Sequence, residues 1–175
     1  MIIIEDGTGV ANANSYITLA DALTQAIQMA LDFTNGTEEQ LIQGVVEINK
    51  YSLHFLSTRT HAIQAALIDF PRNAFTDNNG FPVASDEIPQ GVISAQVQAA
   101  VDVLNGYSVY GTTDGKNVSA EEVVGAVKVA YFNNGTSNDS EGGNRSLATI
   151  NYLKPYIDPS SDLVGGSSGE MLVNY

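Results

Sequence analysis

The chain of 175 residues contains no cysteine and no tryptophan. The absence of cysteine excludes disulfide bonds, thiol catalysis and zinc sites with cysteine ligands. Long apolar runs are also missing, since none approaches the roughly 18 residues that a membrane-spanning helix needs. The apolar run Ile2–Ile4 is too short for a signal peptide, and no basic stretch precedes it. We therefore expect a protein that is made in the cytoplasm and has no membrane partner.

Basic residues are few. The chain has 7 Lys and Arg against 20 Asp and Glu, which gives a net charge of −13. The basic residues are also scattered, with no two closer than the nine positions between Lys50 and Arg59. Binding DNA through its phosphates requires clustered Lys and Arg, so this composition argues against it. The acidic surface is either an ordinary solvated one or a surface that lets DNA slide past without sticking.

Motifs for catalysis, cofactors and metals are missing. Gly7-Thr8-Gly9 lacks the Gly-Lys-Ser/Thr of a phosphate-binding loop, and Asn12 stands where a dinucleotide fingerprint has its third glycine. We therefore interpret this segment as a turn. His54 and His61 are the only histidines and do not form a zinc-binding pattern. No Gly-x-Ser-x-Gly nucleophile motif occurs. We expect neither an enzyme nor a cofactor or metal site.

Two capping patterns predict the first two helices. Thr18 with Asp21, and Thr37 with Gln40, have the spacing of a capping box. Apolar residues after the first cap recur every four positions, which predicts a helix with one apolar face that ends near residues 33–36. The stripe after the second cap is wider, which indicates a central helix of a bundle or one that also meets a partner. The stripes are Leu19, Leu23, Ile27 and Leu31, then Leu41, Val45, Ile48 and Phe55.

A third strong helix is predicted to start at Ile88-Pro89 and to end at Asn105-Gly106, since proline suits the first turn and glycine the end. A short helix over residues 62–70 would end at Pro71. A tight turn is predicted at residues 77–80.

The segment from residue 118 to residue 132 is ambiguous. Ser119–Glu122 resembles a helix cap, but Val127, Val129 and Tyr131 alternate as in a strand. We interpret it as a β-hairpin that turns near Gly125. Ser146 is predicted to cap a short last helix. The predicted fold is therefore mainly α: a small bundle of three main helices and a short C-terminal helix, with a β-hairpin and an N-terminal β-arm. We expect one domain over residues 1–175, with residues 158–175 as a flexible tail.

The N-terminal segment carries the strongest resemblance to a known family. The apolar run is followed by Glu5-Asp6-Gly7-Thr8-Gly9, a loop of small residues, Asn14-Ser15-Tyr16 and Ala20-Asp21-Ala22. This pattern resembles the opening of the head–tail connector, or neck adaptor, proteins of tailed phages, which are often labelled DnaT-like ssDNA-binding proteins. Shorter matches are Gln64–Leu67, Phe70-Pro71-Arg72, Ile88-Pro89 and Ala95-Gln96. The family commonly has tryptophan in place of Phe70.

The resemblance implies a structural virion protein at the phage neck. Such a protein forms a homo-oligomeric ring, typically of twelve subunits, beneath the portal protein and joins the head to the next neck or tail-completion protein. The genomic DNA would pass through its channel without specific binding. The alternative that the family label suggests is a single-stranded DNA-binding protein, which would need a basic groove with stacking aromatic residues.

Both ends of the chain are candidates for subunit contacts. The strand of Ile2, Ile3 and Ile4 must pair with its own chain or with a neighbour. The Ser/Gly-rich tail ends in an apolar group, Met171, Leu172 and Val173. The alternative is that these ends are simply frayed termini.

Overall fold

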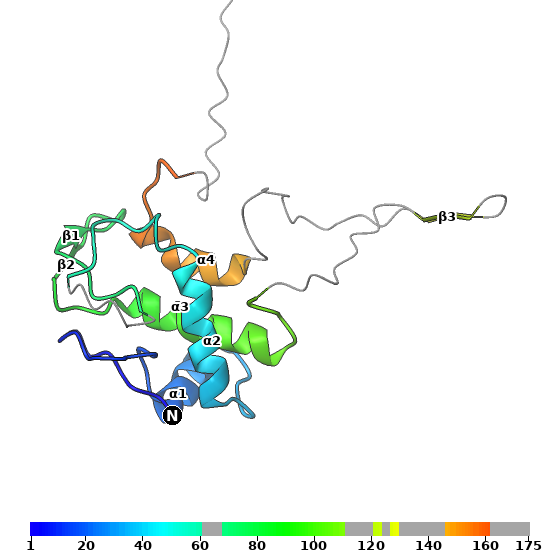
Figure 1. Ribbon diagram of the computed structural model, residues 1–175, viewed down its shortest axis with the longest axis horizontal. Helices are drawn as coiled ribbons and strands as arrows, with labels where there is room; N and C mark the ends of the chain where they lie inside the picture. The colour runs from blue at the N-terminus through cyan, green and yellow to red at the C-terminus, as the bar shows by residue number, and fades with distance from the viewer. Residues whose placement is uncertain (61–67, 111–120, 124–126, 130–145, 162–175) are drawn as a thin grey trace, which may run out of the picture. The chain divides into compact units, whose positions relative to one another are not determined.

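A computed structural model describes residues 1–60, 68–110, 121–123, 127–129 and 146–161. Its residues fall into two compact units, one formed by residues 1–107 and 146–175 and the other by residues 108–145. The helices belong to the first unit and are shown in Figure 1. The prediction of a single connector-like domain over residues 1–175 stays a prediction.

The first helix, α1, spans Leu19–Gln28. Its predicted cap is confirmed, because the Thr18 hydroxyl accepts a hydrogen bond from the Asp21 amide at 3.1 Å. The predicted end near residues 33–36 was wrong by five to eight residues, because the helix ends at Gln28. Ala30 adopts a left-handed conformation with φ of 57°, and the Leu31 amide donates back to the Ala26 carbonyl at 2.8 Å. A left-handed residue with this hydrogen bond terminates a helix. The four-residue spacing of apolar residues, which continues to Leu31, therefore extends beyond the end of the helix.

The predicted apolar face of α1 was also wrong in part. The residues that α1 buries fully are Ala22 and Ala26, whereas the side chain of Ile27 is 77% exposed. Leu19 and Leu23 are half-buried at the edge of the core. The small alanine side chains let α1 approach its neighbours closely, and this close approach decides which face turns inward.

The second helix, α2, spans Glu38–Asn49. Its predicted capping box is confirmed: the Thr37 amide donates to the Gln40 side chain at 2.8 Å, and the Thr37 hydroxyl accepts from the Gln40 amide at 3.5 Å. The helix does not reach Phe55, because turns replace it after Lys50. Phe55 is nevertheless buried, and its backbone forms a bridge with Ile157. Leu53, which lies between Lys50 and Phe55 in the sequence, is 95% exposed.

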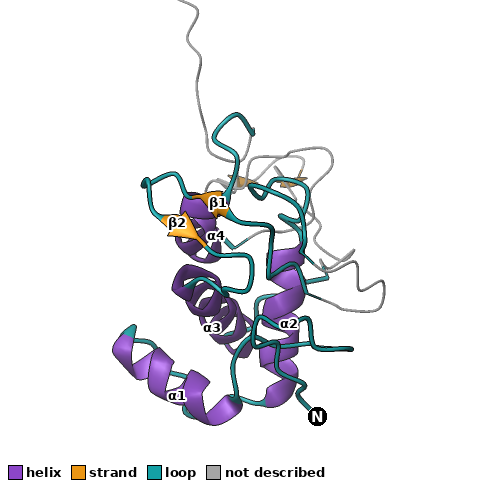
Figure 2. Ribbon diagram, turned by 90° about the vertical axis from the view of Figure 1, so that its left-hand side faces the viewer, coloured by secondary structure: helices purple, strands orange, loops and turns teal. Residues whose placement is uncertain are grey.

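The third helix, α3, spans Gln90–Leu104 and is the centre of the first unit. It begins directly after Pro89 and ends before Gly106, which has φ of 96°, so the predicted boundaries are confirmed. It contacts α1, α2 and α4 (Leu147–Leu153), and Figure 2 shows it between them. A side-chain carbon at Gly44 would lie 2.6 Å from the Gln96 carbonyl oxygen, so only glycine permits this crossing of α2 and α3.

The remaining elements are short. Strands β1 (Phe75–Thr76) and β2 (Pro82–Val83) form an antiparallel pair around the predicted turn at residues 77–80, a hairpin that the sequence did not reveal. Strands β3 (Glu121–Val123) and β4 (Val127–Val129) pair antiparallel, which confirms the hairpin predicted over 118–132. Its turn lies outside the described residues. The predicted cap of α4 is confirmed by the Ser146 hydroxyl, which accepts from the Thr149 amide at 3.1 Å, and the 3-10 helix η1 (Lys154–Tyr156) follows.

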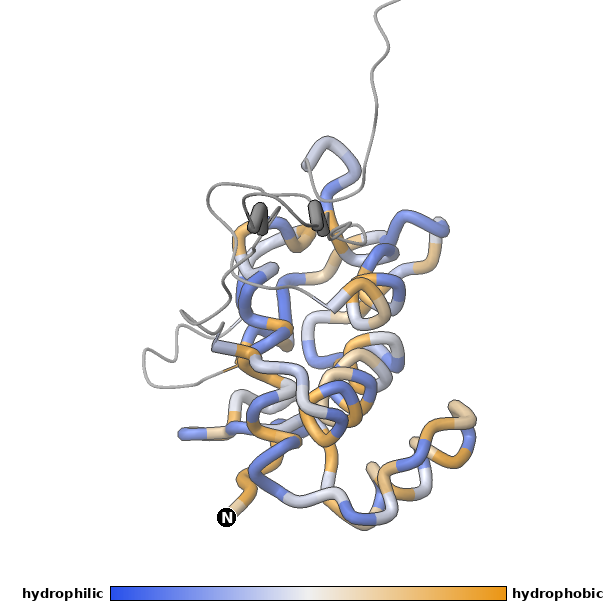
Figure 3. Tube along the Cα trace, turned by 90° about the vertical axis from the view of Figure 1, so that its right-hand side faces the viewer, coloured by the Kyte–Doolittle hydropathy of each residue, from blue (hydrophilic) through white to orange (hydrophobic). Residues whose placement is uncertain are grey.

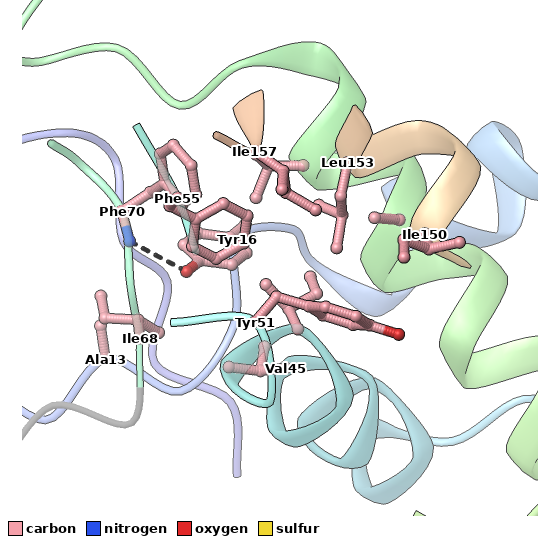
Figure 4. Packing of buried hydrophobic residues seen from close by; sticks show 13 residues of the cluster. Ala13, Tyr16, Val45, Tyr51, Phe55, Ile68, Phe70, Ile150, Leu153 and Ile157 are labelled. Atoms are coloured by element: carbon pink, nitrogen blue, oxygen red, sulfur yellow. Dashed lines mark hydrogen bonds between the residues drawn. The ribbon is translucent and has the colours of Figure 1, made fainter. Parts of the chain in front are cut away.

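Two clusters of buried side chains hold the first unit together. The larger one joins the N-terminal segment, α2, α3, the residues around Phe70, and α4 (Figure 4). The smaller one joins α1, α2 and α3. The larger cluster consists of Ala13, Tyr16, Val45, Ile48, Tyr51, Phe55, Ile68, Phe70, Val92, Ala95, Ile150, Leu153 and Ile157. The smaller cluster consists of Ala22, Ala26, Phe33, Leu41, Val97, Ala100 and Val101. The fold is mainly helical, as predicted.

Candidate functional site

The N-terminal arm is paired with its own chain. Ile4 forms a parallel bridge with Ser15, the Ile3 amide donates to the Asn14 side chain at 2.8 Å, and the Asn14 amide returns a bond to the Ile3 carbonyl at 2.9 Å. Ile2, Ile3 and Ile4 are half-buried, and the first two pack against the two core clusters. Of the two partners predicted for this strand, its own chain and a neighbour, the structure shows the first. A role for these three residues in a subunit interface stays a prediction, and Met171, Leu172 and Val173 lie outside the described residues.

A buried carboxylate organises the turn that follows the arm. Glu5 is 1% exposed, and its carboxylate oxygens accept three backbone hydrogen bonds: from Gly7 at 2.9 Å, from Gly9 at 2.7 Å and from Val10 at 2.7 Å. Backbone amides that converge in this way form an anion-binding nest. Here the nest already holds an anion from the same chain.

This geometry explains why Gly7-Thr8-Gly9 is a turn and not a phosphate cradle. The amides that would hold a phosphate are bonded to Glu5, and the Thr8 amide donates to the exposed Asp6 side chain at 3.0 Å. Gly7 has φ of 100°, and a side-chain carbon there would collide with the Asp86 carbonyl oxygen. Glycine is therefore required at this position, where the turn meets the segment that leads into α3.

Residues from separate motifs of the resemblance meet around one buried amide. Gln96, on α3, accepts a hydrogen bond from the Tyr16 amide at 3.0 Å. Its own NH2 group donates to the Ser15 hydroxyl at 2.7 Å and to the Leu41 carbonyl at 2.9 Å. Gln96 thus joins the N-terminal segment to both α2 and α3. Asn14-Ser15-Tyr16 and Ala95-Gln96, which are eighty residues apart, form one structural unit.

The Tyr16 hydroxyl binds the segment that contains Phe70-Pro71-Arg72. It accepts a hydrogen bond from the Asp69 amide at 2.9 Å. It also accepts one from the Phe70 amide at 3.1 Å (Figure 4). The Tyr16 and Phe70 rings also pack edge to face, with centroids 6.5 Å apart. Burial raises the pKa of the Tyr16 hydroxyl well above its ordinary value, so the group stays protonated at neutral pH. Tyr16 thus holds the N-terminal segment against the segment that contains Phe70.

The same segment contains a buried ionic cluster. Asp69 is fully buried and accepts hydrogen bonds from the Ser52 hydroxyl at 2.6 Å and from Arg59, with which it forms an ion pair. The Arg72 guanidinium lies 3.8 Å from the Asp69 carboxylate and donates to the Leu56 and Ser57 carbonyls at 3.1 and 2.7 Å. Burial lowers the pKa of Arg72, while the negative charge of Asp69 opposes that shift. Both arginines are occupied within the fold.

A second polar cluster lies where residues 107 and 146 meet α2. Glu47 is fully buried, and its carboxylate forms an ion pair with Lys50 at 2.6 Å and accepts from the Tyr107 hydroxyl at 3.2 Å and the Ser146 amide at 2.9 Å. Burial raises the pKa of the Tyr107 hydroxyl above its ordinary value, and the negative charge of Glu47 raises it further. Glu47 thereby ties together the two places where the chain leaves and re-enters the first unit.

The cations of the described residues are mostly committed to carboxylates of the same chain. Lys50 pairs with Glu47, and Arg59 and Arg72 pair with Asp69. Lys154 is the remaining basic side chain within the part of the chain that the structure describes, and it is exposed on η1. The described surface therefore has no basic groove of the kind that single-stranded DNA requires.

The structure also places the histidines and acids considered for metal binding. His54 is half-buried beside Phe55, and His61 lies outside the described residues. Within the residues that the structure covers, no three histidine, aspartate or glutamate side chains gather as a metal ion would need. None of the helices in that part of the chain is long and apolar enough to span a bilayer.

Sequence reasoning missed the buried polar residues that organise the site: Glu5, Glu47, Asp69 and Gln96. Nothing in the local pattern distinguishes Glu47 from an exposed helical glutamate. For Glu5 a signal existed, since an acid placed directly before a Gly-x-Gly turn is suited to accept the turn's amides. For the other two, the partners come from distant segments.

Replacing Tyr16 with phenylalanine is expected to lower the free energy of unfolding by ~2 kcal/mol, because two buried amides lose their acceptor. The aromatic ring and its packing against Phe70 stay in place, so the change isolates the hydroxyl. Urea unfolding followed by circular dichroism measures the effect. The matched control is Tyr110→Phe, since Tyr110 is exposed. Equal stability of the two variants would show that the Tyr16 hydroxyl does not hold the segment.

The model of a family described as "Putative DnaT-like ssDNA binding protein" matches residues 1–173. No curated protein and no solved structure matches the chain.

Proposed function

The chain belongs to the Putative DnaT-like ssDNA binding protein family, and from that premise we propose two candidate functions, of which the first is a structural subunit of a phage head–tail connector. The observation that carries this proposal is electrostatic. The chain has a net charge of −13, and three of the four basic side chains described are paired with carboxylates of the same subunit. A protein of this kind is suited to stand beside DNA without adhering to it.

In this proposal the protein assembles into a ring, of about twelve copies by resemblance, that sits beneath the portal protein and continues the DNA channel. The helical unit supplies a rigid body, and the two ends of the chain supply subunit contacts. A ring requires a heterologous interface in which two different surfaces of each subunit meet. The N-terminal residues 2–4 and the C-terminal residues 171–173 are the candidate surfaces. The next neck or tail-completion protein would bind the opposite face of the ring.

Native mass measurement tests the assembly. We expect the purified protein to form a complex of about twelve copies when it is mixed with the portal ring. Deleting residues 171–173 is expected to reduce that complex while the circular dichroism spectrum of the helical unit stays unchanged, because the buried residues of the two core clusters lie between Ala13 and Ile157. A protein that stays monomeric and never joins the portal would contradict the connector proposal.

The second candidate is a single-stranded DNA-binding protein, which the description of the family favours. Contacts with phosphates would have to come from Lys154 or from three further basic residues, Lys116, Lys128 and Arg145. The side chains of these three are not among those that the structure describes. Exposed aromatic side chains suitable for stacking on bases are present at Phe81 and Tyr110.

Fluorescence anisotropy with a labelled oligothymidine at low salt separates the two candidates. The connector proposal predicts no saturable binding at micromolar protein, because few free cations are available to release counterions. Tight binding that weakens steeply with added salt, and that Lys154→Glu reduces further, would favour the second candidate. The control is Leu53→Glu, which introduces a glutamate at a different position, where the side chain is 95% exposed.

A further inference from the structure

Asparagine is a chemically labile residue, and a glycine directly after it makes the loss of its side-chain amide easier. The backbone nitrogen of the next residue attacks the side-chain carbonyl carbon of asparagine, and glycine, which has no side chain, leaves that approach unobstructed. The part of the chain that the structure describes contains three such steps: Asn35-Gly36, Asn79-Gly80 and Asn105-Gly106. The sequence makes these steps equivalent, and the structure distinguishes them.

Asn79-Gly80 lies in the turn between β1 and β2, and both residues are exposed. Figures 2 and 3 show this turn at the surface of the first unit, with hydrophilic residues along it. Apart from its two chain neighbours, no described residue comes within 4 Å of the position that a side-chain carbon of Gly80 would occupy. The backbone at this step therefore has room to rotate.

A hydrogen bond restrains the attacking nitrogen in this turn. The Gly80 amide donates to the Asp77 carbonyl at 2.9 Å, and this bond must open before the nitrogen can approach the Asn79 side chain. The Asp77 carboxylate accepts from the amides of Asn79 and Phe81 at 2.9 and 2.8 Å. Because this second acceptor is a side chain, it can follow the backbone when the first bond opens.

Asn35-Gly36 is held against the core. The Gly36 amide donates to the Phe33 carbonyl at 2.8 Å, and a side-chain carbon at Gly36 would collide with the buried Phe33 ring. Rotating the Gly36 nitrogen toward Asn35 would move this backbone against a ring of the smaller core cluster. The packing cost comes in addition to the hydrogen bond that must open.

Asn105-Gly106 belongs to the end of α3. The Gly106 amide donates to the Val103 carbonyl at 3.0 Å, and the Tyr107 amide donates to the Asp102 carbonyl at 2.9 Å. Both acceptors are backbone carbonyls that the helix holds in place, so they cannot follow a rotation at Asn105. This step is therefore restrained by two fixed acceptors.

We propose that Asn79 is the site in the described chain at which deamidation occurs first. The Gly80 nitrogen forms a bond with the Asn79 side-chain carbonyl carbon, and its proton leaves with the side-chain NH2 group as ammonia. Water then opens the resulting cyclic imide at either carbonyl, which gives aspartate or isoaspartate. Both products add a negative charge beside Asp77, and isoaspartate also lengthens the backbone of the turn by a methylene group. The inference is independent of both candidate functions, since it requires neither a ring nor DNA.

The change has a structural consequence because the preceding residue joins this turn to η1. The Asn78 amide donates to the Pro155 carbonyl at 2.8 Å. The Asn78 side chain donates to the carbonyls of Lys154 and Ile157 at 2.9 and 2.7 Å. A longer backbone at residue 79 displaces Asn78 from these acceptors, so isoaspartate loosens the contact between the turn and η1.

Peptide mass spectrometry of the full chain, kept under native conditions at mildly alkaline pH, measures deamidation at each of the three steps. Asn79 is expected to react at least about fivefold faster than Asn35 and Asn105, the ratio that corresponds to one further hydrogen bond to open. The same chain in guanidinium chloride is the matched control, and there the three rates should become similar. Faster reaction at Asn35 or Asn105 in the native protein, or the same ranking in denaturant, would overturn the proposal.

Hydrogen exchange tests the consequence for η1. The Asn78 amide is expected to exchange about fivefold faster in aged native protein than in fresh protein, as the loss of a hydrogen bond implies. Asn79→Asp carries the added charge on a backbone of normal length and should exchange as the fresh protein does. Unchanged exchange in the aged protein, or equal acceleration in Asn79→Asp, would overturn the assignment of this effect to isoaspartate.

Discussion

Replacing Asp69 with alanine is expected to lower the free energy of unfolding by about 3–5 kcal/mol, the cost of removing one partner from a buried ion pair. Asp69 is fully buried and Arg72 is 6% exposed. Without the carboxylate, the Arg72 charge would remain in the core with only carbonyl oxygens as partners, and the Ser52 hydroxyl and Arg59 would lose their acceptor. Natural domains have total stabilities of about 5–15 kcal/mol, so this loss is large.

Chemical unfolding of the full chain measures this effect, and Asp86→Ala is the control because Asp86 is exposed. If Asp69→Ala does not fold, Ser52→Ala removes a single hydrogen bond to the same carboxylate and should cost ~1 kcal/mol. A loss of less than 1 kcal/mol for Asp69→Ala would mean that the cluster around Phe70-Pro71-Arg72 does not stabilise the fold in the way described.

Glu5→Gln is expected to lower the free energy of unfolding by about 3 kcal/mol. Glutamine has the same shape as glutamate, so no cavity forms. One of its two oxygens is replaced by an NH2 group, which cannot accept the hydrogen bonds that the amides of Gly7, Gly9 and Val10 donate. The turn would then keep at least one buried donor without an acceptor, and the loss of charge weakens the remaining bonds.

The neighbouring residue offers a matched control for this change. Asp6→Asn alters an exposed carboxylate in the same turn, whose partners are the Thr8 amide and hydroxyl, and solvent can replace it. Its effect is expected to stay below ~1 kcal/mol. Hydrogen exchange provides a second readout, because the amides of Gly7, Gly9 and Val10 should exchange faster in Glu5→Gln. Similar exchange rates in the two variants would show that Glu5 does not organise the turn.

The parts of the fold that the sequence predicted are those that local chemistry decides. At Thr18, Thr37 and Ser146 the cap's own hydroxyl accepts a hydrogen bond from the backbone amide three residues later, and all three bonds are present. The start of α3 after Pro89 and its end before Gly106 also follow from single residues. These features need no knowledge of the tertiary structure.

The errors arose where packing between distant segments decides the outcome. The alanines of α1 turn inward because they permit close approach to α3, so Ile27 is left outside although it is the larger apolar residue. The apolar stripe of α2 continues to Phe55 in the sequence, but Phe55 is buried by pairing with Ile157 after the helix has ended. Periodicity records that these residues are apolar and does not identify their partners.

In the cluster around Gln96 and Tyr16, too, the sequence indicated the local motifs but not the contacts between distant segments. The segments that carried the resemblance were recognisable in the sequence, and the structure brings Ser15, Tyr16, Phe70 and Gln96 together through hydrogen bonds and ring contacts. Their role is to hold the N-terminal segment to the helices. That role could not be predicted, because it depends on Gln96 being buried opposite Tyr16. The motifs therefore describe the architecture of this chain and do not by themselves identify a binding surface.

A density map of the protein bound to the portal ring, obtained by electron cryomicroscopy, tests the central proposal most directly. The proposal predicts a ring of this protein, of about twelve copies by resemblance, beneath the portal, with Asp and Glu side chains in excess over Lys and Arg along the channel. A channel surface lined by Lys and Arg, or a portal ring that leaves the protein unbound, would contradict it.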